Sequence, residues 1–275
     1  MKKFTQIIFM LFATGLILSS CQKVKEDAIE DTEMLEASAM IDMSYELDFS
    51  VGVDQSAQND SYHPEIPPQP SMPSNCATIT VETAPDGGFP RTFTVDFGEG
   101  CEYNGFVRSG MLIITLSDYF MTPGCQMSIQ RVNYEVNSWK IEGTVVFINA
   151  TTNDNTPSWS RSINNGVFTN PAMEVFTHSG NRTITQIGGY GNLDLEDNVY
   201  EVSSGTHTLT KQGGSSMTIE IISPLVKAFS CDYLSEGVMK IQGSLLNGEV
   251  DYGNGECDNS AIYTHHNGLT FKMNL

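Results

Sequence analysis

A glycine-rich stretch near the C-terminus brings several oxygen-bearing side chains close together in the sequence. Asp251, Asn254, Glu256 and Asp258 fall within residues 251–258. Carboxylate and amide oxygens on a flexible turn are the ligands that Ca²⁺ prefers, although the spacing here is not that of an EF-hand loop. Glycine and asparagine also build ordinary tight turns whose acids face water. Calcium is therefore a hypothesis for this loop beside a plain solvated turn, and we expect no cofactor elsewhere.

Four of the cysteines form two similarly spaced pairs. The segment 95–101, Val-Asp-Phe-Gly-Glu-Gly-Cys, recurs in modified form at 250–257, Val-Asp-Tyr-Gly-Asn-Gly-Glu-Cys. Four cysteines allow three pairings, and the matched spacing favours disulfides Cys76–Cys101 and Cys231–Cys257. Each would close the open end of a candidate hairpin. Loops of this size contribute about 3.5 kcal/mol each in the chain-entropy model.

The remaining chemistry-bearing residues do not combine into a catalytic site. Cys125 has no counterpart in the paired pattern, and we expect a buried thiol, with a reactive or intermolecular role as the alternative. His178 and His207 have no neighbours at metal-ligand spacing. The sequence also contains no nucleophile elbow, zinc-protease, Walker or dinucleotide-binding motif. We therefore expect that the protein is not an enzyme.

The N-terminus has the composition of a secretory signal. Lys2 and Lys3 precede a short apolar stretch at 7–18, which is too short to span a bilayer. The next residues, Leu-Ser-Ser-Cys at 18–21, resemble the lipobox of bacterial lipoproteins. That resemblance implies a signal peptide at 1–20 and acylation of Cys21, which becomes the first residue of the mature chain. Two or three acyl chains suffice for a stable membrane anchor.

The segment that follows Cys21 is strongly acidic. The whole chain carries 14 basic and 33 acidic residues, a net charge of -19. Within residues 22–75 there are twelve acids and two lysines, followed by a proline-rich run. Such a surface repels nucleic-acid phosphates, so we expect no nucleic-acid partner. We expect residues 21–75 to form a lipidated acidic and proline-rich tether.

The secondary structure of residues 26–53 is ambiguous in the sequence. Residues 26–43 fit an amphipathic helix, whereas Met43, Tyr45, Leu47, Phe49, Val51 and Val53 alternate with the period of a strand. A helix still accommodates part of this pattern, so both interpretations stay open.

From residue 76 onward the sequence reads as antiparallel β structure. Short β-branched runs such as 78–81, 92–95 and 111–116 alternate with turn residues, including the Asn-Gly pairs at 247–248 and 267–268. Such pairs are strong hairpin signals. We expect an all-β domain over 76–275, either a sandwich or an elongated meander. The repeated cysteine segments suggest two related halves, at about 76–190 and 191–275.

The chain is similar to an uncharacterised group of Bacteroidota surface and outer-membrane lipoproteins. The similarity is carried by the segments 76–81, 89–101, 223–226 and 251–259, with the cysteines that they contain or flank. Lys-Glu-Asp at 25–27 resembles the export signal of such surface lipoproteins. The resemblance implies an outer-membrane lipoprotein on the cell surface, with the periplasmic face as the alternative, but it implies no activity.

We expect a non-catalytic binding or structural module that recognises a glycan or an envelope protein. One alternative is a fimbrial or assembly subunit, because Leu269, Phe271, Met273 and Leu275 alternate up to the last residue, as in a donor strand. The other alternative is a carbohydrate-binding surface lipoprotein. Its candidate aromatic platform is drawn from Tyr103, Phe106, Tyr119, Trp139, Trp159 and Tyr190.

Overall fold

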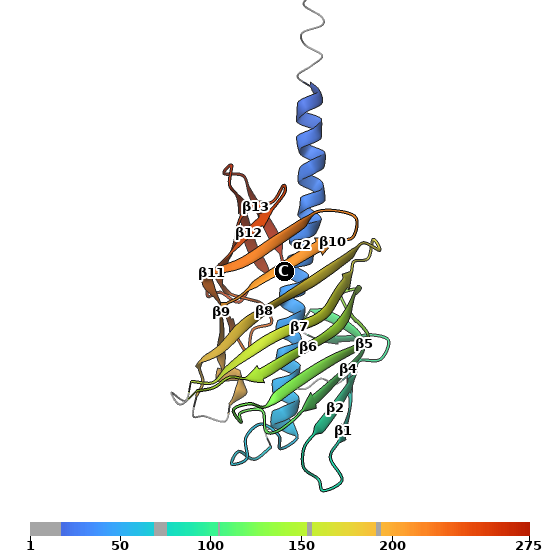
Figure 1. Cartoon of the computed structure of the whole chain (residues 1–275), viewed down its shortest axis with the longest axis vertical. Helices are drawn as coiled ribbons and strands as arrows, with labels where there is room; N and C mark the ends of the chain where they lie inside the picture. Colours follow the sequence, from blue (N-terminus) through green and yellow to red (C-terminus); the bar gives the residue numbers. More distant parts are fainter. Residues whose placement is uncertain (1–17, 69–75, 104, 153–155, 191–193) are drawn as a thin grey trace, which may run out of the picture.

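The longest element of the structure is a single helix inside a curved β-sheet. The computed structural model describes residues 18–68, 76–103, 105–152, 156–190 and 194–275. Helix α2 (Leu18–Gln58) follows the long axis of the molecule. The sheet wraps around its C-terminal part, while its N-terminal part projects beyond the strands (Figure 1). No helix in the described residues is both long and apolar enough to cross a membrane.

The sheet contains fifteen strands within the described residues. They are β1 (Thr78–Glu82), β2 (Arg91–Asp96), β3 (Cys101–Tyr103), β4 (Phe106–Leu116), β5 (Gln126–Val136), β6 (Trp139–Asn149), β7 (Ser158–Thr169), β8 (Val175–Gly188), β9 (Val199–Ser204), β10 (Thr206–Lys211), β11 (Ser216–Ala228), β12 (Glu236–Gly243), β13 (Asn247–Asn254), β14 (Ser260–His265) and β15 (Thr270–Asn274). A short 3-10 helix, η1 (Leu195–Asp197), precedes β9.

Most strands pair with their neighbours in sequence, and every described pairing is antiparallel. The main path runs β1-β2-β4-β5-β6-β7-β8-β10-β11-β12-β13-β14-β15, while β3 pairs with β4 and β9 pairs with both β8 and β11. The prediction of an antiparallel all-β fold is confirmed. Of the two arrangements expected, the meander applies, because the strands form one continuous sheet. The pairings of β8 with β9 and β10 also join the two expected halves into one sheet.

The segment from Met34 to Ala57 belongs to the core and not to a spacer. All nine residues from Ile41 to Phe49 are buried, which covers every side of a helix with 3.6 residues per turn. The tether prediction is therefore wrong for residues 34–57, and the ambiguous part of the chain is helical. A helix buried on all sides lacks the single apolar stripe of a surface helix. Apolar and polar residues therefore alternate along this part of α2 with the period that is typical of a strand.

Two glycines permit close approaches that a side chain would block. A Cβ at Gly52 would collide with Sδ of Met127, so this glycine lets α2 lie directly against β5. Gly110 has a φ of +75°, and a Cβ there would collide with the backbone of Asn133. It lies where the register of β4 against β5 shifts between Ser109 and Met111. Such bulges bend a strand and help a sheet to curve.

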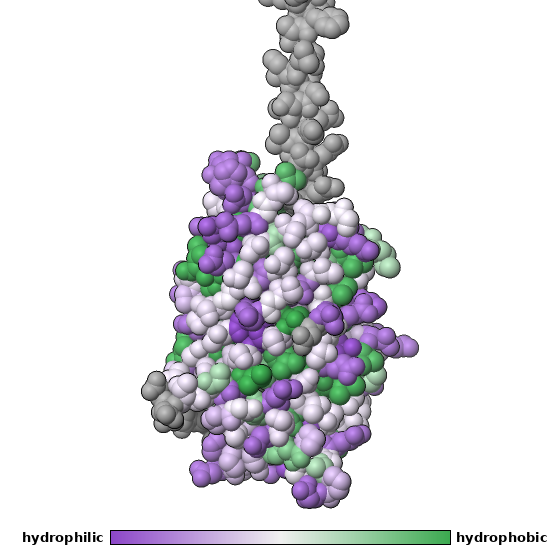
Figure 2. All heavy atoms as spheres, in the orientation of Figure 1, coloured by the Kyte–Doolittle hydropathy of each residue, from purple (hydrophilic) through white to green (hydrophobic). Residues whose placement is uncertain are grey.

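Aromatic packing fixes the C-terminal half of α2 in the sheet. Phe49 contacts four aromatic rings, with centroid distances of 5.1–6.0 Å, from Phe120, Phe147, Trp159 and Tyr200. Phe120 and Trp159 stack with centroids 4.9 Å apart. On the face drawn in Figure 2, by contrast, apolar residues occur in small patches between polar ones.

Candidate functional site

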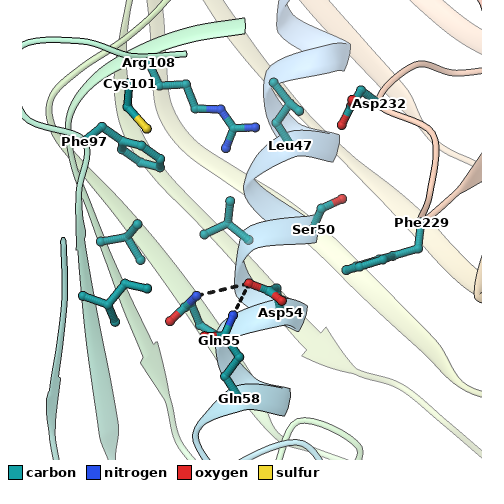
Figure 3. Close-up of a pocket in the computed structure, with 13 residues that line it drawn as sticks. Leu47, Ser50, Asp54, Gln55, Gln58, Phe97, Cys101, Arg108, Phe229 and Asp232 are labelled. Atoms are coloured by element: carbon teal, nitrogen blue, oxygen red, sulfur yellow. Dashed lines mark hydrogen bonds between the residues drawn. The ribbon is translucent and has the colours of Figure 1, made fainter. Parts of the chain in front are cut away.

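A groove lies between α2 and the sheet. It contains about 820 Å³ of space that is partly open to solvent, and its residues come from three parts of the fold (Figure 3). Helix α2 contributes Leu47, Ser50, Val51, Asp54, Gln55 and Gln58; strands β1 to β4 with their connections contribute Ile79, Val95, Phe97, Cys101 and Arg108; and the β11–β12 loop contributes Phe229 and Asp232. The helical residues recur every three or four positions, so they form one stripe on α2.

Arg108 is the central charged group of this groove. Its side chain extends from β4 toward α2 (Figure 3), and the residue is only 7% exposed. Its Cζ atom lies 5.5 Å from the centroid of the Phe97 ring, which is a cation–π contact. Among the described residues, its guanidinium group forms no hydrogen bond or ion pair, and its Nε atom is buried without a partner. The groove therefore contains a buried positive charge that has no described carboxylate at ion-pair distance, although it acts electrostatically on Asp48 of α2.

The acids of the groove are engaged by other groups. Asp54 accepts hydrogen bonds from the side-chain amides of Gln55, at 3.2 Å, and Gln58. Asp232 lies across the groove from Arg108 and acts electrostatically on Lys227, whose pKa is lowered by burial despite the nearby acids. Lys227 is buried, and its Nζ atom donates to the carbonyl oxygen of Cys231 at 2.5 Å.

On its other sides, α2 carries acids that are paired with arginines of the sheet. All six side chains are at most 3% exposed. The pairs and their N···O distances are Arg131–Asp48 at 2.5 Å, Arg161–Glu46 at 2.9 Å and Arg182–Asp42 at 2.8 Å. Burial raises the pKa of both Asp42 and Asp48 above its ordinary value, against the opposing effect of their arginine partners. Tyr45 lies between two of the pairs, with its ring 4.7 and 4.9 Å from the Cζ atoms of Arg131 and Arg161.

Two histidines that are distant in sequence meet beside these pairs. The rings of His178 and His207 are 4.7 Å apart, and the Nη2 atom of Arg182 lies 2.8 Å from Nδ1 of His207. Since arginine is only a donor, Nδ1 of His207 accepts this bond, and the ring is neutral. Burial first, and then the charge of Arg182, lower the pKa of both histidines well below the usual value.

The structure contains both predicted disulfides. The Cα atoms are 5.4 Å apart in Cys76–Cys101 and 5.8 Å apart in Cys231–Cys257. Cys125 is a buried free thiol whose Sγ atom lies 3.2 Å from the carbonyl oxygen of Asp118. Burial raises its pKa, which disfavours the reactive thiolate.

The predicted calcium loop forms turns that use its acids internally. Asp251 accepts a hydrogen bond from the backbone of Gly253, and Asp258 accepts two from Ser260. Asn254 and Glu256 are exposed. No group of three or more histidine, cysteine, aspartate or glutamate side chains in the described part of the chain could hold a metal ion. The calcium hypothesis stays untested and gains no support from this geometry.

The aromatic residues considered for a glycan platform are dispersed. Phe106 and Trp159 are buried in the core, Trp139 packs against Phe176, and Tyr190 is exposed. Tyr119 packs against Phe89, and the side chain of Tyr103 lies outside the described residues. Cys21 lies in the first turn of α2, and the acylation predicted for it is not tested by the fold.

The sequence prediction missed the residues of the groove and the three buried pairs. A signal was present, because Arg131 follows Met127 and Ile129 at the same alternating positions of one strand, and Arg161 lies between Trp159 and Ile163. An arginine in phase with the apolar residues of a strand must face the interior. Comparison with protein-family models, curated proteins and solved structures finds no match for this chain.

Proposed function

We propose that this protein is a lipid-anchored envelope protein, displayed on the cell surface, whose β domain is a non-catalytic binding or structural module. The lipobox-like residues 18–21 and the export-like residues 25–27 support this assignment. The observation that carries it is the continuity of α2, which leads from Cys21 into the centre of the sheet.

Helix α2 connects the proposed lipid anchor at Cys21 to the folded domain. Thirteen residue steps lead along α2 from Cys21 to Met34, which is buried in the core. At a rise of about 1.5 Å per residue, they span roughly 20 Å. Beyond Met34, aromatic contacts and ion pairs hold α2 within the sheet. This arrangement suits a module that is presented at a defined distance from a membrane.

The alternative of a fimbrial subunit depends on β15 acting as a donor strand. Strand β15 pairs with β14 over five residue pairs, and Met273 is buried in the core. Donating β15 to another subunit would break these pairs and expose Met273. The occupied strand therefore favours the anchored module, and a monomeric mass for the purified protein is the expected result.

The test of the anchor is the Cys21→Ser variant, with Cys125→Ser as the matched control. In bacteria that process lipoproteins, we expect the wild-type protein and Cys125→Ser in the membrane fraction, with an acylated N-terminal peptide by mass spectrometry. The Cys21→Ser variant should lose both properties. Proteolysis of intact cells should degrade the β domain if it faces outward. An unacylated wild-type N-terminus would refute the proposal, and protection from protease would refute surface display.

A further inference from the structure

The groove beside α2 combines one unneutralised cation with apolar walls. Arg108 is 93% buried, yet its guanidinium forms no ion pair with any described residue. Burying a charge is unfavourable unless it is paired or hydrogen-bonded. The three other buried arginines that face α2 each have a carboxylate within 2.9 Å. Arg108 is the exception, and it is also the one that lines the cavity.

The surroundings of Arg108 are suited to an apolar chain. Phe97 lies beside the guanidinium, and Val95, Val51 and Ile79 continue the apolar lining between β1, β2 and the helix. Ile79 is 36% exposed on strand β1, so the apolar lining extends to the surface. Small-molecule sites are mostly apolar with a few oriented polar groups, and the lining of this groove has that composition.

The charges around the groove restrict the ligand to a single negative charge. One guanidinium can pair with one carboxylate through two parallel hydrogen bonds. Asp54 and Asp232 also line the groove, and their charges repel a polyanion. The net charge of -19 acts in the same direction.

We propose that this groove binds a monocarboxylate amphiphile of the fatty-acid type. Its carboxylate accepts hydrogen bonds from Arg108, and its acyl chain lies along Phe97, Val95, Val51 and Ile79. The ligand supplies the negative charge that α2 supplies to the other three arginines. This site is independent of acylation at Cys21 and of the membrane face on which the domain lies.

The experiment measures binding of decanoate by isothermal titration calorimetry. The protein is the chain from residue 21 onward with Cys21→Ser, which retains all described strands and the buried part of α2 and needs no detergent. We expect one decanoate per chain and at least tenfold weaker binding of decanol, because a hydrogen bond to a charged group is lost. Amide hydrogen exchange should slow in residues 47–58 and 93–108 when decanoate binds.

The decisive variant is Arg108→Met, with Lys140→Met as the matched control. Both lose one positive charge, but Lys140 is an exposed residue of β6 and does not line the groove. Arg108→Met should weaken decanoate binding at least tenfold and abolish the preference over decanol, whereas Lys140→Met should stay within twofold of the parent. A second variant, Ile79→Ser on the edge strand, should weaken decanoate binding without altering the circular dichroism spectrum.

Four results would overturn the proposal. The first is the absence of decanoate binding by the folded parent protein, and the second is unchanged binding by Arg108→Met. The third is tighter binding of decyl phosphate than of decanoate, which would assign the groove to a phosphate head group. The fourth is selective binding of a peptide with a free C-terminal carboxylate, but not of decanoate, which would assign it to a protein terminus.

Discussion

Buried arginines form ion pairs with helix α2 on one side of the helix, whereas the buried arginine on the other side forms none with the described residues. Toward strands β5, β7 and β8, three arginines meet three acids of the helix at N···O distances of 2.5–2.9 Å. Toward β4 and the groove, Arg108 faces Leu47 and the Phe97 ring without a carboxylate partner among the described residues. The same residue type is therefore neutralised within the fold on one side and left available on the other.

Paired and unpaired buried charges therefore have different roles in this fold. A buried ion pair is weak evidence for net stability, because desolvation offsets the attraction, but removing one partner alone is strongly destabilising. The three pairs therefore fix the rotation and depth of α2 in the sheet. Arg108 forms no ion pair with the described residues of the helix and acts on Asp48 only at longer range, so we propose that its charge selects the ligand of the groove.

The largest expected effect is the loss of one partner on the paired side. In Arg131→Met, Asp48 remains buried without its arginine, and we expect the free energy of unfolding to fall by about 3–5 kcal/mol. Denaturant unfolding followed by circular dichroism measures this change. The double variant Asp48→Leu/Arg131→Met should recover most of the loss, because it removes both charges. A loss below about 1 kcal/mol in the single variant would show that the pair does not hold the helix.

The next effect is a pH dependence that arises on the paired side. His178 and His207 have pKa values well below normal when folded, through burial and then Arg182. Between the folded pKa and the unfolded value near 6.5, the unfolded chain binds more protons, so stability falls as the pH decreases below about 6.5. Each histidine contributes a slope of up to about 1.4 kcal/mol per pH unit.

The variant His207→Gln isolates this contribution. The raised pKa values of Asp42 and Asp48 act in the opposite direction, since the folded state holds extra protons above pH 3.8. Both acids remain in the variant, so the difference in slope from wild type reports the histidine. We expect a shallower loss of stability in unfolding curves collected from pH 7 to pH 5. Identical slopes would contradict the assignment of a neutral His207.

A smaller and opposite effect is expected on the groove side. Without ligand, Arg108→Met removes a buried charge that forms no ion pair with a described residue, although it also removes a longer-range attraction to Asp48. We therefore expect the free energy of unfolding to rise by about 1 kcal/mol or to remain unchanged. The same denaturant titration measures it. A fall of more than about 1 kcal/mol would mean that Arg108 supports the fold as the other three arginines do.

The smallest effect is expected for an exposed pair. Lys140 and Glu142 are 2.9 Å apart, but both side chains are nearly half exposed. Solvent screens such pairs, so Lys140→Met should change the free energy of unfolding by about 0.5 kcal/mol or less. A larger change would mean that burial does not explain the difference between this pair and Arg131–Asp48.

Local patterns in the sequence predicted the antiparallel strands and both disulfides, but they left a sandwich and a meander as alternatives. Alternating residues, such as Met127, Ile129 and Arg131 in β5, specify a strand with one buried face. The Asn-Gly pair at 267–268 lies in the turn between β14 and β15, as predicted. The turn predicted at 247–248 is wrong, because these two residues begin β13 and the connection is formed by residues 244–246. The matched separations within the two cysteine pairs predicted the disulfides, because each pair closes a locally formed unit. These features depend on residues that are close in sequence or that repeat with a fixed period.

The position of α2 and the identity of the groove were decided only by the tertiary structure. Asp48 meets Arg131 and Glu46 meets Arg161 across 83 and 115 positions of the chain. The periodicity of the sequence does not show which arginines form an ion pair with a carboxylate, nor that Arg108 forms none within the described residues. Burial on every side also removed the apolar stripe by which a helix is recognised in a sequence. The sequence by itself determined an antiparallel β-rich domain with two disulfides, and the wrapping of the sheet around α2 determined which acids and arginines are buried and which of them are paired.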